Sequence, residues 1–169
     1  EIVRTNCLRR KAMYLSENHD RHRALDVVRA SSSLPFVSKI VEVDGIPMLD
    51  GGIADSIPVQ HAIDMGWQHN VVVLTRNKGW RDMGKDHKIP YLYKNYPRLR
   101  VALSHRHRAY NEQIQLVDDL EAAGKITCIR PIRPLEVGRI EKDTDKLERL
   151  YEEGFMLGEA FCEKCVEKE

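Results

Sequence analysis

The sequence lacks the features that mark several large classes of protein. Its four cysteines in 169 residues are too few and too scattered for a disulfide scaffold. No apolar run approaches the roughly 18 residues that a membrane-spanning helix needs, and no secretory signal is recognisable. A net charge of +1 argues against a general nucleic-acid binder, whose domain is usually strongly basic. We therefore expect a cytoplasmic protein with no nucleic-acid partner.

What the sequence does contain is typical of one globular domain. Apolar residues make up 42% of the chain and charged residues 31%. A compact fold of this length buries roughly 70% of the surface that its unfolded chain exposes. We expect residues 1–169 to form a single domain. Because the sequence opens on a strand-like run without an initiating Met, we also expect it to be part of a longer protein.

The first half, residues 1–77, has the element order of a layered α/β core. Asp44-Gly45 lies between two apolar runs, which predicts a β-hairpin. After Asp50 we expect a helix that is capped by Asp55 or Ser56. The other predicted elements are two extended runs (1–7 and 11–15), a helix over 23–31, and a strand over 71–74 that is buried on both faces because it is continuously apolar. This order predicts a three-layer α/β fold with a mostly parallel sheet flanked by helices.

The second half, residues 78–169, is predicted to be a helical region with one strand. We expect a long, mostly helical stretch over 91–123 that is interrupted at Pro97. A strand candidate follows at 125–130, and an amphipathic helix covers 143–166.

Positive charge is concentrated in residues 76–110. This segment carries ten Lys and Arg residues against Asp82 and Asp86, a local net charge of +8, and among its aromatic residues are Trp80, Tyr91, Tyr93 and Tyr96. Two explanations stay open. The segment is either a solvated basic surface or a patch that attracts anionic lipid headgroups, with its aromatic side chains at the membrane boundary.

Asp50 is the strongest candidate for a catalytic group. It ends an apolar strand, and open α/β sheets place their sites in the crevice outside the carboxyl ends of the strands. Gly51 and Gly52 let the backbone turn sharply and let another group approach the carboxylate. From these three residues alone, an ordinary turn aspartate is the commoner explanation.

The other candidate sites have plainer explanations. Ser31, Ser32 and Ser33 are better understood as residues that end a helix than as nucleophiles. Cys162 and Cys165 are half of a zinc pattern, but no second pair exists, so we expect structural thiols and no metal site. His105 and His107 would point apart on a helix, which also argues against a metal site.

Three motifs, taken in order, resemble the patatin-like phospholipase family and in particular a bacterial branch of it. They are the segment Ala30–Phe36 (ASSSLPF), the Asp44-Gly45 hairpin and the segment Met48–Val59 (MLDGGIADSIPV). That family has a small-residue segment followed by an Asp-Gly-Gly or Asp-Gly-Ala motif, whose aspartate completes a serine–aspartate dyad. The later helix-to-strand step and the C-terminal region are also similar, so the resemblance covers nearly the whole chain.

The resemblance implies an acyl hydrolase that acts on lipid esters without a cofactor. Asp50 matches the position of the dyad base, and Gly51 and Gly52 match its supporting turn. The base takes the proton of the serine hydroxyl as the serine attacks. The family's glycine-rich oxyanion loop and Gly-x-Ser-x-Gly nucleophile elbow do not occur in this sequence. We therefore interpret the chain as the C-terminal part of such an enzyme, which supplies the base but no nucleophile and is inactive alone.

Two alternatives belong to other classes. The first is a non-catalytic module that keeps the fold and docks onto a membrane, through residues 76–110, or onto a protein. The second, a phosphate-binding domain that uses Gly51 and Gly52 at a helix start, is weaker because Asp50 would repel a phosphate. Without the upstream half, the incomplete sheet exposes apolar edges, so we expect association with a second copy of the chain or with the missing half. The protein is expected to be cytoplasmic or peripheral at a membrane.

Overall fold

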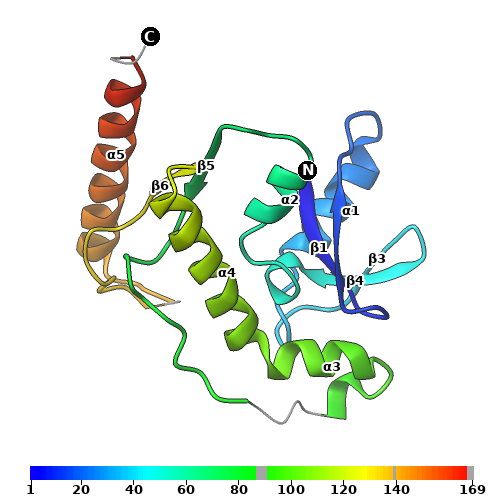
Figure 1. Ribbon diagram of the computed structural model, residues 1–169. Helices are drawn as coiled ribbons and strands as arrows, with labels where there is room; N and C mark the ends of the chain where they lie inside the picture. The colour runs from blue at the N-terminus through cyan, green and yellow to red at the C-terminus, as the bar shows by residue number, and fades with distance from the viewer. Residues whose placement is uncertain (87–90, 139, 167–169) are drawn as a thin grey trace. The chain divides into compact units, whose positions relative to one another are not determined.

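The structure is a computed structural model that describes residues 1–86, 91–138 and 140–166. It is a mixed α/β structure with two compact units, each made from two segments of the chain (Figure 1). Unit 1 comprises Glu1–Pro58 and Asp82–Leu116, and unit 2 comprises Val59–Arg81 and Val117–Glu169. The single domain expected over residues 1–169, with its division at residue 77, stays a prediction.

Unit 1 is built on a four-stranded antiparallel sheet with the strand order β2-β1-β4-β3. Its strands are β1 (Ile2–Asn6), β2 (Lys11–Leu15), β3 (Val41–Val43) and β4 (Ile46–Asp50). The predicted hairpin at Asp44-Gly45 is confirmed, and both residues have the positive φ values, 53° and 73°, that its tight turn requires.

The expected mostly parallel sheet is not found in this part of the structure. Strands β1 and β2, like β3 and β4, are joined by connections so short that each pair must run antiparallel, and β1 is also antiparallel to β4. The only parallel pair among the described residues is β5 (Asn70–Val73) with β6 (Ile126–Ile129).

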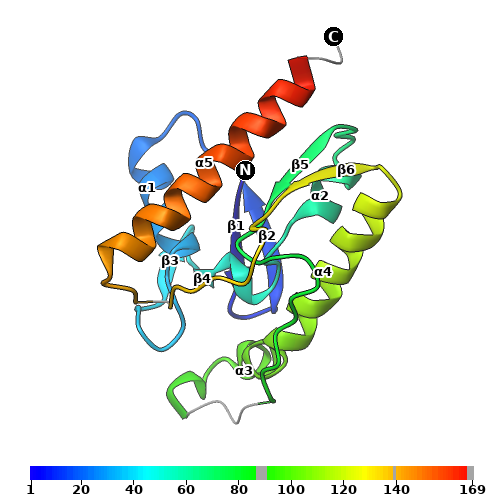
Figure 2. The same ribbon diagram turned by 90° about the vertical axis from the view of Figure 1, so that its left-hand side faces the viewer.

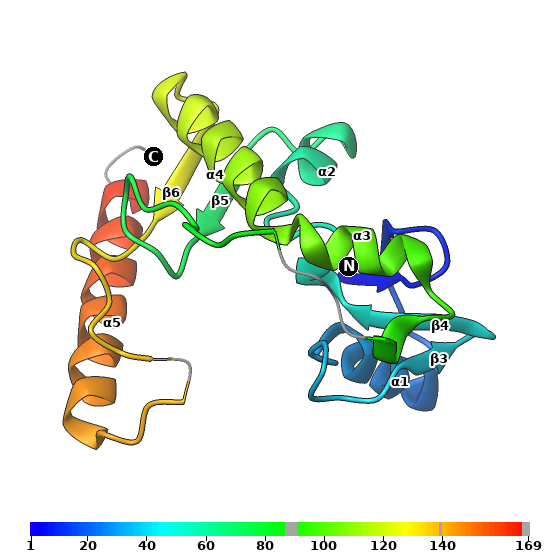
Figure 3. The ribbon, with the colours of Figure 1, turned by 90° about the horizontal axis from the view of Figure 1, so that it is seen from below.

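Helices cover both faces of the unit 1 sheet (Figure 3). Helix α1 (Arg21–Ser31) begins after Asp20, whose carboxylate caps the main-chain N–H groups of His22 and Arg23. On the opposite face lie the 3-10 turn η2 (Tyr91–Tyr93) and helix α3 (Pro97–Ser104). The core on the α1 side contains Val27, Ala30, Val41, Val43 and Met48, and the core on the α3 side contains Cys7, Leu49, Ile53, Tyr93, Leu99 and Leu103.

Unit 2 contains the parallel strands β5 and β6, which lie side by side in Figure 2. Helix α2 (Val59–Asp64) precedes β5, and helix α5 (Thr144–Val166) follows β6. The prediction that residues 71–74 are buried on both faces is wrong, because Val71 and Val73 are 47% and 72% exposed. In the described part of the chain only β6 pairs with β5, and nothing covers the face that carries these two valines.

The long helical stretch predicted over 91–123 is divided differently from the prediction. Pro97 begins helix α3 instead of interrupting a helix, which suits a residue that has no N–H to donate. The break falls at His105, between α3 and helix α4 (Arg106–Ala122). The first residues of α4 belong to unit 1 and its last residues to unit 2. Of the helices in the described ranges, none is both long and apolar enough to cross a membrane.

Candidate active site

Asp50 ends β4 and is followed directly by the 3-10 turn η1 (Gly51–Ile53). Its carboxylate is half-buried, and Oδ1 accepts the main-chain N–H of Gly52 at 2.7 Å. Within the described ranges, no lysine, arginine or histidine forms an ion pair with this carboxylate. The side chain is therefore held by one neutral donor and keeps acceptor capacity for a further donor.

The main chain of Asp50 is held from two sides of unit 1. Its N–H donates to the carbonyl oxygen of Ser33, just beyond α1, at 3.0 Å. Its own carbonyl oxygen accepts the hydroxyl of Thr5 on β1 at 2.8 Å. Because Ser33 and Thr5 are both buried, these bonds are shielded from water. They fix the position of the Asp50 main chain, from which the carboxylate side chain extends.

The two glycines are required for different physical reasons. A Cβ on Gly51 would lie 2.4 Å from the main-chain oxygen of Val3, so only glycine lets η1 pass this close to β1. A Cβ on Gly52 would lie 3.1 Å from Asp50 Oδ1 and 3.8 Å from a guanidinium nitrogen of Arg106. Gly51 thus serves the packing of the turn, and Gly52 keeps space beside the carboxylate.

Arg106 is a residue of this site that the sequence analysis missed. As the first residue of α4, it donates from Nε to the carbonyl oxygen of Gly52 at 3.0 Å, and the Ser56 hydroxyl donates to the same oxygen at 2.7 Å. The two donors fix the turn and bring a positive charge close to Asp50. No local pattern marks Arg106, which lies 54 positions after Gly52 in the chain.

Asp55 has a different role from the predicted helix cap. Helix α2 begins only at Val59, and the Asp55 carboxylate instead accepts the Tyr14 hydroxyl at 2.5 Å and the Gln113 amide at 3.0 Å. The Gln113 side-chain oxygen accepts the main-chain N–H groups of Ser56 and Ile57. These bonds tie the segment after η1 to β2 and α4, so Asp55 braces the turn that carries Asp50.

The hydroxyl groups of the three serines at the end of α1 donate to main-chain carbonyl groups. Ser31 donates from its hydroxyl to the Val3 carbonyl at 2.7 Å, and Ser32 and Ser33 donate to carbonyl groups of α1. This is the behaviour expected of residues that end a helix, and it does not suit a nucleophile.

The prediction that His105 and His107 point apart is wrong. Because the helix breaks at His105, both imidazoles approach the same oxygen of Asp86, at 3.1 and 3.5 Å, and Arg108 pairs with the other oxygen at 2.5 Å. Although desolvation opposes it, the hydrogen bond from His105 and the charge of Arg108 hold the pKa of Asp86 below its ordinary value.

The thiols are unlike one another in their surroundings. Cys7 is buried, Cys128 is partly buried and Cys162 is exposed, while the side chain of Cys165 lies outside the described residues. Burial raises the pKa of the Cys7 thiol to about 12. Nowhere in residues 1–86, 91–138 and 140–166 do three or more His, Cys, Asp or Glu side chains gather as a metal site requires.

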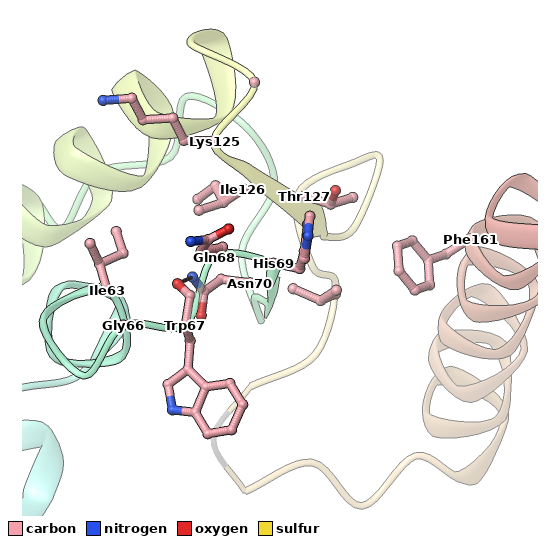
Figure 4. A pocket seen from close by; sticks show the side chains of 12 residues that line it. Ile63, Gly66, Trp67, Gln68, His69, Asn70, Lys125, Ile126, Thr127 and Phe161 are labelled. Atoms are coloured by element: carbon pink, nitrogen blue, oxygen red, sulfur yellow. Dashed lines mark hydrogen bonds between the residues drawn. The ribbon is translucent and has the colours of Figure 1, made fainter. Parts of the chain in front are cut away.

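A hollow of about 710 Å³ in unit 2 does not include Asp50. It lies where β5 and β6 begin, at Asn70 and Ile126, and not at the carboxyl ends of strands where α/β sheets place their sites. Figure 4 shows Phe161 of α5 facing His69 and Thr127 across this hollow.

Several positive charges of the segment 76–110 are balanced by carboxylates. Lys78 pairs with Glu121 at 3.1 Å, and Arg81 pairs with Asp118 at 3.0 Å. Arg76 lies over the Trp80 ring, 4.8 Å from its centroid. Residues 87–90 lie outside the described ranges. The membrane-docking role of this segment stays a prediction.

Comparisons with known proteins find two family models that match parts of this chain. Residues 9–63 match the family model of the patatin-like phospholipases, and this range contains both the segment after α1 and the Asp50-Gly51-Gly52 turn. The predicted resemblance to this family is confirmed over these residues. Residues 96–167, which include α3, α4 and α5, match a domain of unknown function (DUF6363).

A similar protein is known from Escherichia coli (strain K12), where it is called uncharacterized protein YjjU. The two sequences are 29% identical over 147 residues, which cover 81% of this chain and 40% of that protein. The chain thus spans about two fifths of the length of this relative.

Proposed function

We propose that this chain is the base-bearing part of a lipid acyl hydrolase, in which Asp50 and a serine from polypeptide outside this chain form a catalytic dyad. The observation that carries the proposal is the state of the Asp50 carboxylate. It stands on a turn fixed by the bonds to Ser33 and Thr5, yet among the described residues only the Gly52 N–H donates to it. The match of residues 9–63 to patatin-like phospholipases supports a lipid ester as the substrate.

The reaction follows from the chemistry of such a pair. The serine oxygen bonds to the acyl carbonyl carbon of the ester while its proton passes to Asp50. Main-chain N–H groups stabilise the oxyanion that forms. The carbon–oxygen bond to the leaving alcohol then breaks, and that alcohol takes the proton from Asp50. Water attacks the acyl-serine in the same way and releases the fatty acid.

The same proposal accounts for the exposed strands of unit 2. Strands β5 and β6 are parallel, and Val71 and Val73 are left exposed. In the full-length protein, further strands would pair at the free edges of β5 and β6 and helices would cover the face of Val71 and Val73, which completes a mostly parallel, three-layer sheet. The chain alone would then associate with its own copies through this edge and would have no activity. The alternative, a docking module that keeps the fold without the reaction, predicts membrane or protein binding with no hydrolysis.

Covalent labelling tests the proposal. The full-length protein is treated with a fluorophosphonate probe, which reacts with activated serines, and the labelled peptide is identified by mass spectrometry. We expect one labelled serine outside residues 1–169 and no labelling of the isolated chain. A label on Ser31, Ser32, Ser33 or any other serine of this chain, or the absence of any label on the full-length protein, would contradict the proposal.

A further inference from the structure

Two segments of unit 1 expose large apolar side chains to solvent. Val37 and Tyr91 are 82% and 75% exposed, and Leu34, Phe36 and Leu92 are at least half exposed. We call these five residues the apolar patch. Exposed apolar side chains that occur singly need no explanation, but five on two contacting segments indicate an interaction surface.

The two segments of the apolar patch are held together by Tyr93. The Phe36 N–H donates to the Tyr93 hydroxyl at 2.9 Å, and the two rings lie 5.5 Å apart between centroids. Tyr93 itself is buried in the core beside Leu99. Phe36 has a φ of 67°, which residues with a bulky side chain rarely adopt. These contacts therefore hold the loop in a conformation that leaves Val37 in solvent.

The two chain segments that carry the apolar patch contribute positive charge and no carboxylate side chains of their own. Residues 27–41 and 91–111 contain no Asp or Glu, whereas Lys39, Lys94 and Arg98 are exposed within them. The Lys94 ammonium lies 5.2 Å from the centre of the Tyr91 ring. Apolar and aromatic side chains bordered by lysine and arginine are the composition that binds anionic lipid surfaces. A second copy of the patch would bring like charges face to face, which disfavours self-association through it.

The apolar patch adjoins the candidate active site through the chain itself. Leu34 follows Ser33, whose carbonyl oxygen holds the main-chain N–H of Asp50 at 3.0 Å. We propose that the apolar patch docks the protein onto an anionic lipid surface, with Val37 and Leu92 entering the membrane interface and Lys39 and Lys94 contacting the headgroups. The docking itself does not depend on the proposed hydrolase function. The further step, in which docking delivers substrate to Asp50, does rest on that function.

Vesicle co-sedimentation of the full-length protein tests this inference. The vesicles are phosphatidylcholine alone or phosphatidylcholine with phosphatidylserine. We expect binding to the anionic vesicles that weakens as salt is added. The double variant Val37→Ser/Leu92→Ser is expected to bind at least about tenfold more weakly. Leu25→Ser removes a leucine of α1 that is 59% exposed, against 67% for Leu92, and is the matched control, expected to bind within about twofold of wild type.

Charge variants keep the test decisive if the double serine variant does not fold. Lys39→Gln and Lys94→Gln change exposed side chains only, and each is expected to weaken binding to anionic vesicles about fivefold. The inference is overturned if wild type binds no anionic vesicles at low salt, or if Val37→Ser/Leu92→Ser binds like wild type. It is also overturned if that variant changes only the oligomeric state in light scattering, since the patch would then be a protein interface.

One further variant separates this inference from the proposed function. Asp50→Asn is expected to bind vesicles like wild type while losing hydrolysis. If wild type shows no hydrolysis but its vesicle binding still depends on Val37 and Leu92, the hydrolase proposal fails and the docking surface stands. If hydrolysis is normal but no vesicle binding is seen, the docking surface fails alone.

Discussion

The main-chain N–H of Asp50 donates a hydrogen bond to the carbonyl oxygen of Ser33, with a distance of 3.0 Å between nitrogen and oxygen. This bond joins the end of α1 to the end of β4, so the small-residue segment and the Asp-Gly-Gly turn form one structural element. Helix α1 is seated on the sheet by Val27 and Ala30. The packing of α1 therefore helps to determine where the candidate catalytic carboxylate stands.

The two glycines after Asp50 are expected to respond differently to the same substitution. In Gly51→Ala the new methyl group meets the main-chain oxygen of Val3 at 2.4 Å, and the backbone cannot easily move away. We expect a loss of about 1–3 kcal/mol in the free energy of unfolding, measured with urea. In Gly52→Ala the nearest atom is the movable Oδ1 of Asp50 at 3.1 Å. Here we expect little change in stability but about tenfold slower ester hydrolysis by the full-length protein. Equal stability losses in the two variants would contradict this division of roles.

The hydrogen bond from Tyr14 to Asp55 is predicted to stabilise unit 1. Tyr14→Phe leaves the ring in place but removes a donor to a carboxylate, so we expect a loss of about 1–2 kcal/mol in urea unfolding. Tyr151→Phe is the matched control, since the Tyr151 ring on α5 is 71% exposed, and we expect no measurable change. If both variants unfold at the same urea concentration as wild type, Asp55 does not brace the turn.

The buried Cys7 thiol predicts a loss of stability at alkaline pH. Its pKa is about 12 in the folded protein, against an ordinary value of 9.0. Below pH 9 both states hold the proton, so this group has no effect. Between pH 9 and 12 only the unfolded chain releases the proton, and stability falls by up to about 1.4 kcal/mol for each pH unit. Urea unfolding from pH 8 to 10.5 measures the slope, which should be shallower in Cys7→Ala. An identical slope in the two proteins would show that Cys7 does not contribute.

The ion pairs of Arg23 predict a loss of stability at acid pH. Main-chain N–H groups of Asp20 and His19, together with the Arg23 guanidinium, lower the pKa of Glu17 from 4.5 to about 2. The hydrogen bonds from Arg23 also hold the pKa of Asp44 below its usual range. The contribution of these carboxylates is therefore complete above pH 4.5 and is lost as the pH falls towards 2.

The corresponding measurement compares urea midpoints at pH 6 and pH 3. Arg23→Met should narrow the difference between the two midpoints, because it removes a partner of both carboxylates. Arg21→Met changes an exposed arginine of the same helix and is the control. If the difference between the urea midpoints at pH 6 and pH 3 is the same in Arg23→Met as in wild type, these ion pairs do not contribute to the loss of stability at acid pH.

Those parts of the fold that depend on local chemistry could be predicted from the sequence. Asp44-Gly45 makes a hairpin because its turn needs the positive φ values that these two residues adopt. The burial of a strand could not be predicted as readily. The continuous apolar run 71–74 was interpreted as a strand buried on both faces, but an apolar run shows only that a strand prefers burial. It does not show that the covering layer is part of the same chain.

In the candidate site, too, local features could be predicted from the sequence and long-range contacts could not. Asp50, Gly51 and Gly52 are neighbours in sequence, so their association needed no tertiary information. The contacts of Asp55 with Tyr14 and of Arg106 with Gly52 join residues more than 40 positions apart, and neither has a periodic or spacing pattern. His105 and His107 were misjudged because the prediction assumed an unbroken helix, whereas the break at His105 turns both rings towards Asp86.

The initial rate of hydrolysis of a soluble short-chain ester by the full-length protein tests the role of Asp50 most directly. Asp50→Asn removes the proton acceptor with almost no change in shape. Asp64→Asn makes the same change at an exposed position of α2, where the carboxylate accepts a hydrogen bond from Gln60. We predict that Asp50→Asn lowers the rate about 10²–10⁴-fold and that Asp64→Asn stays within about twofold of wild type. A rate for Asp50→Asn close to that of wild type would contradict the assignment of Asp50 as the base.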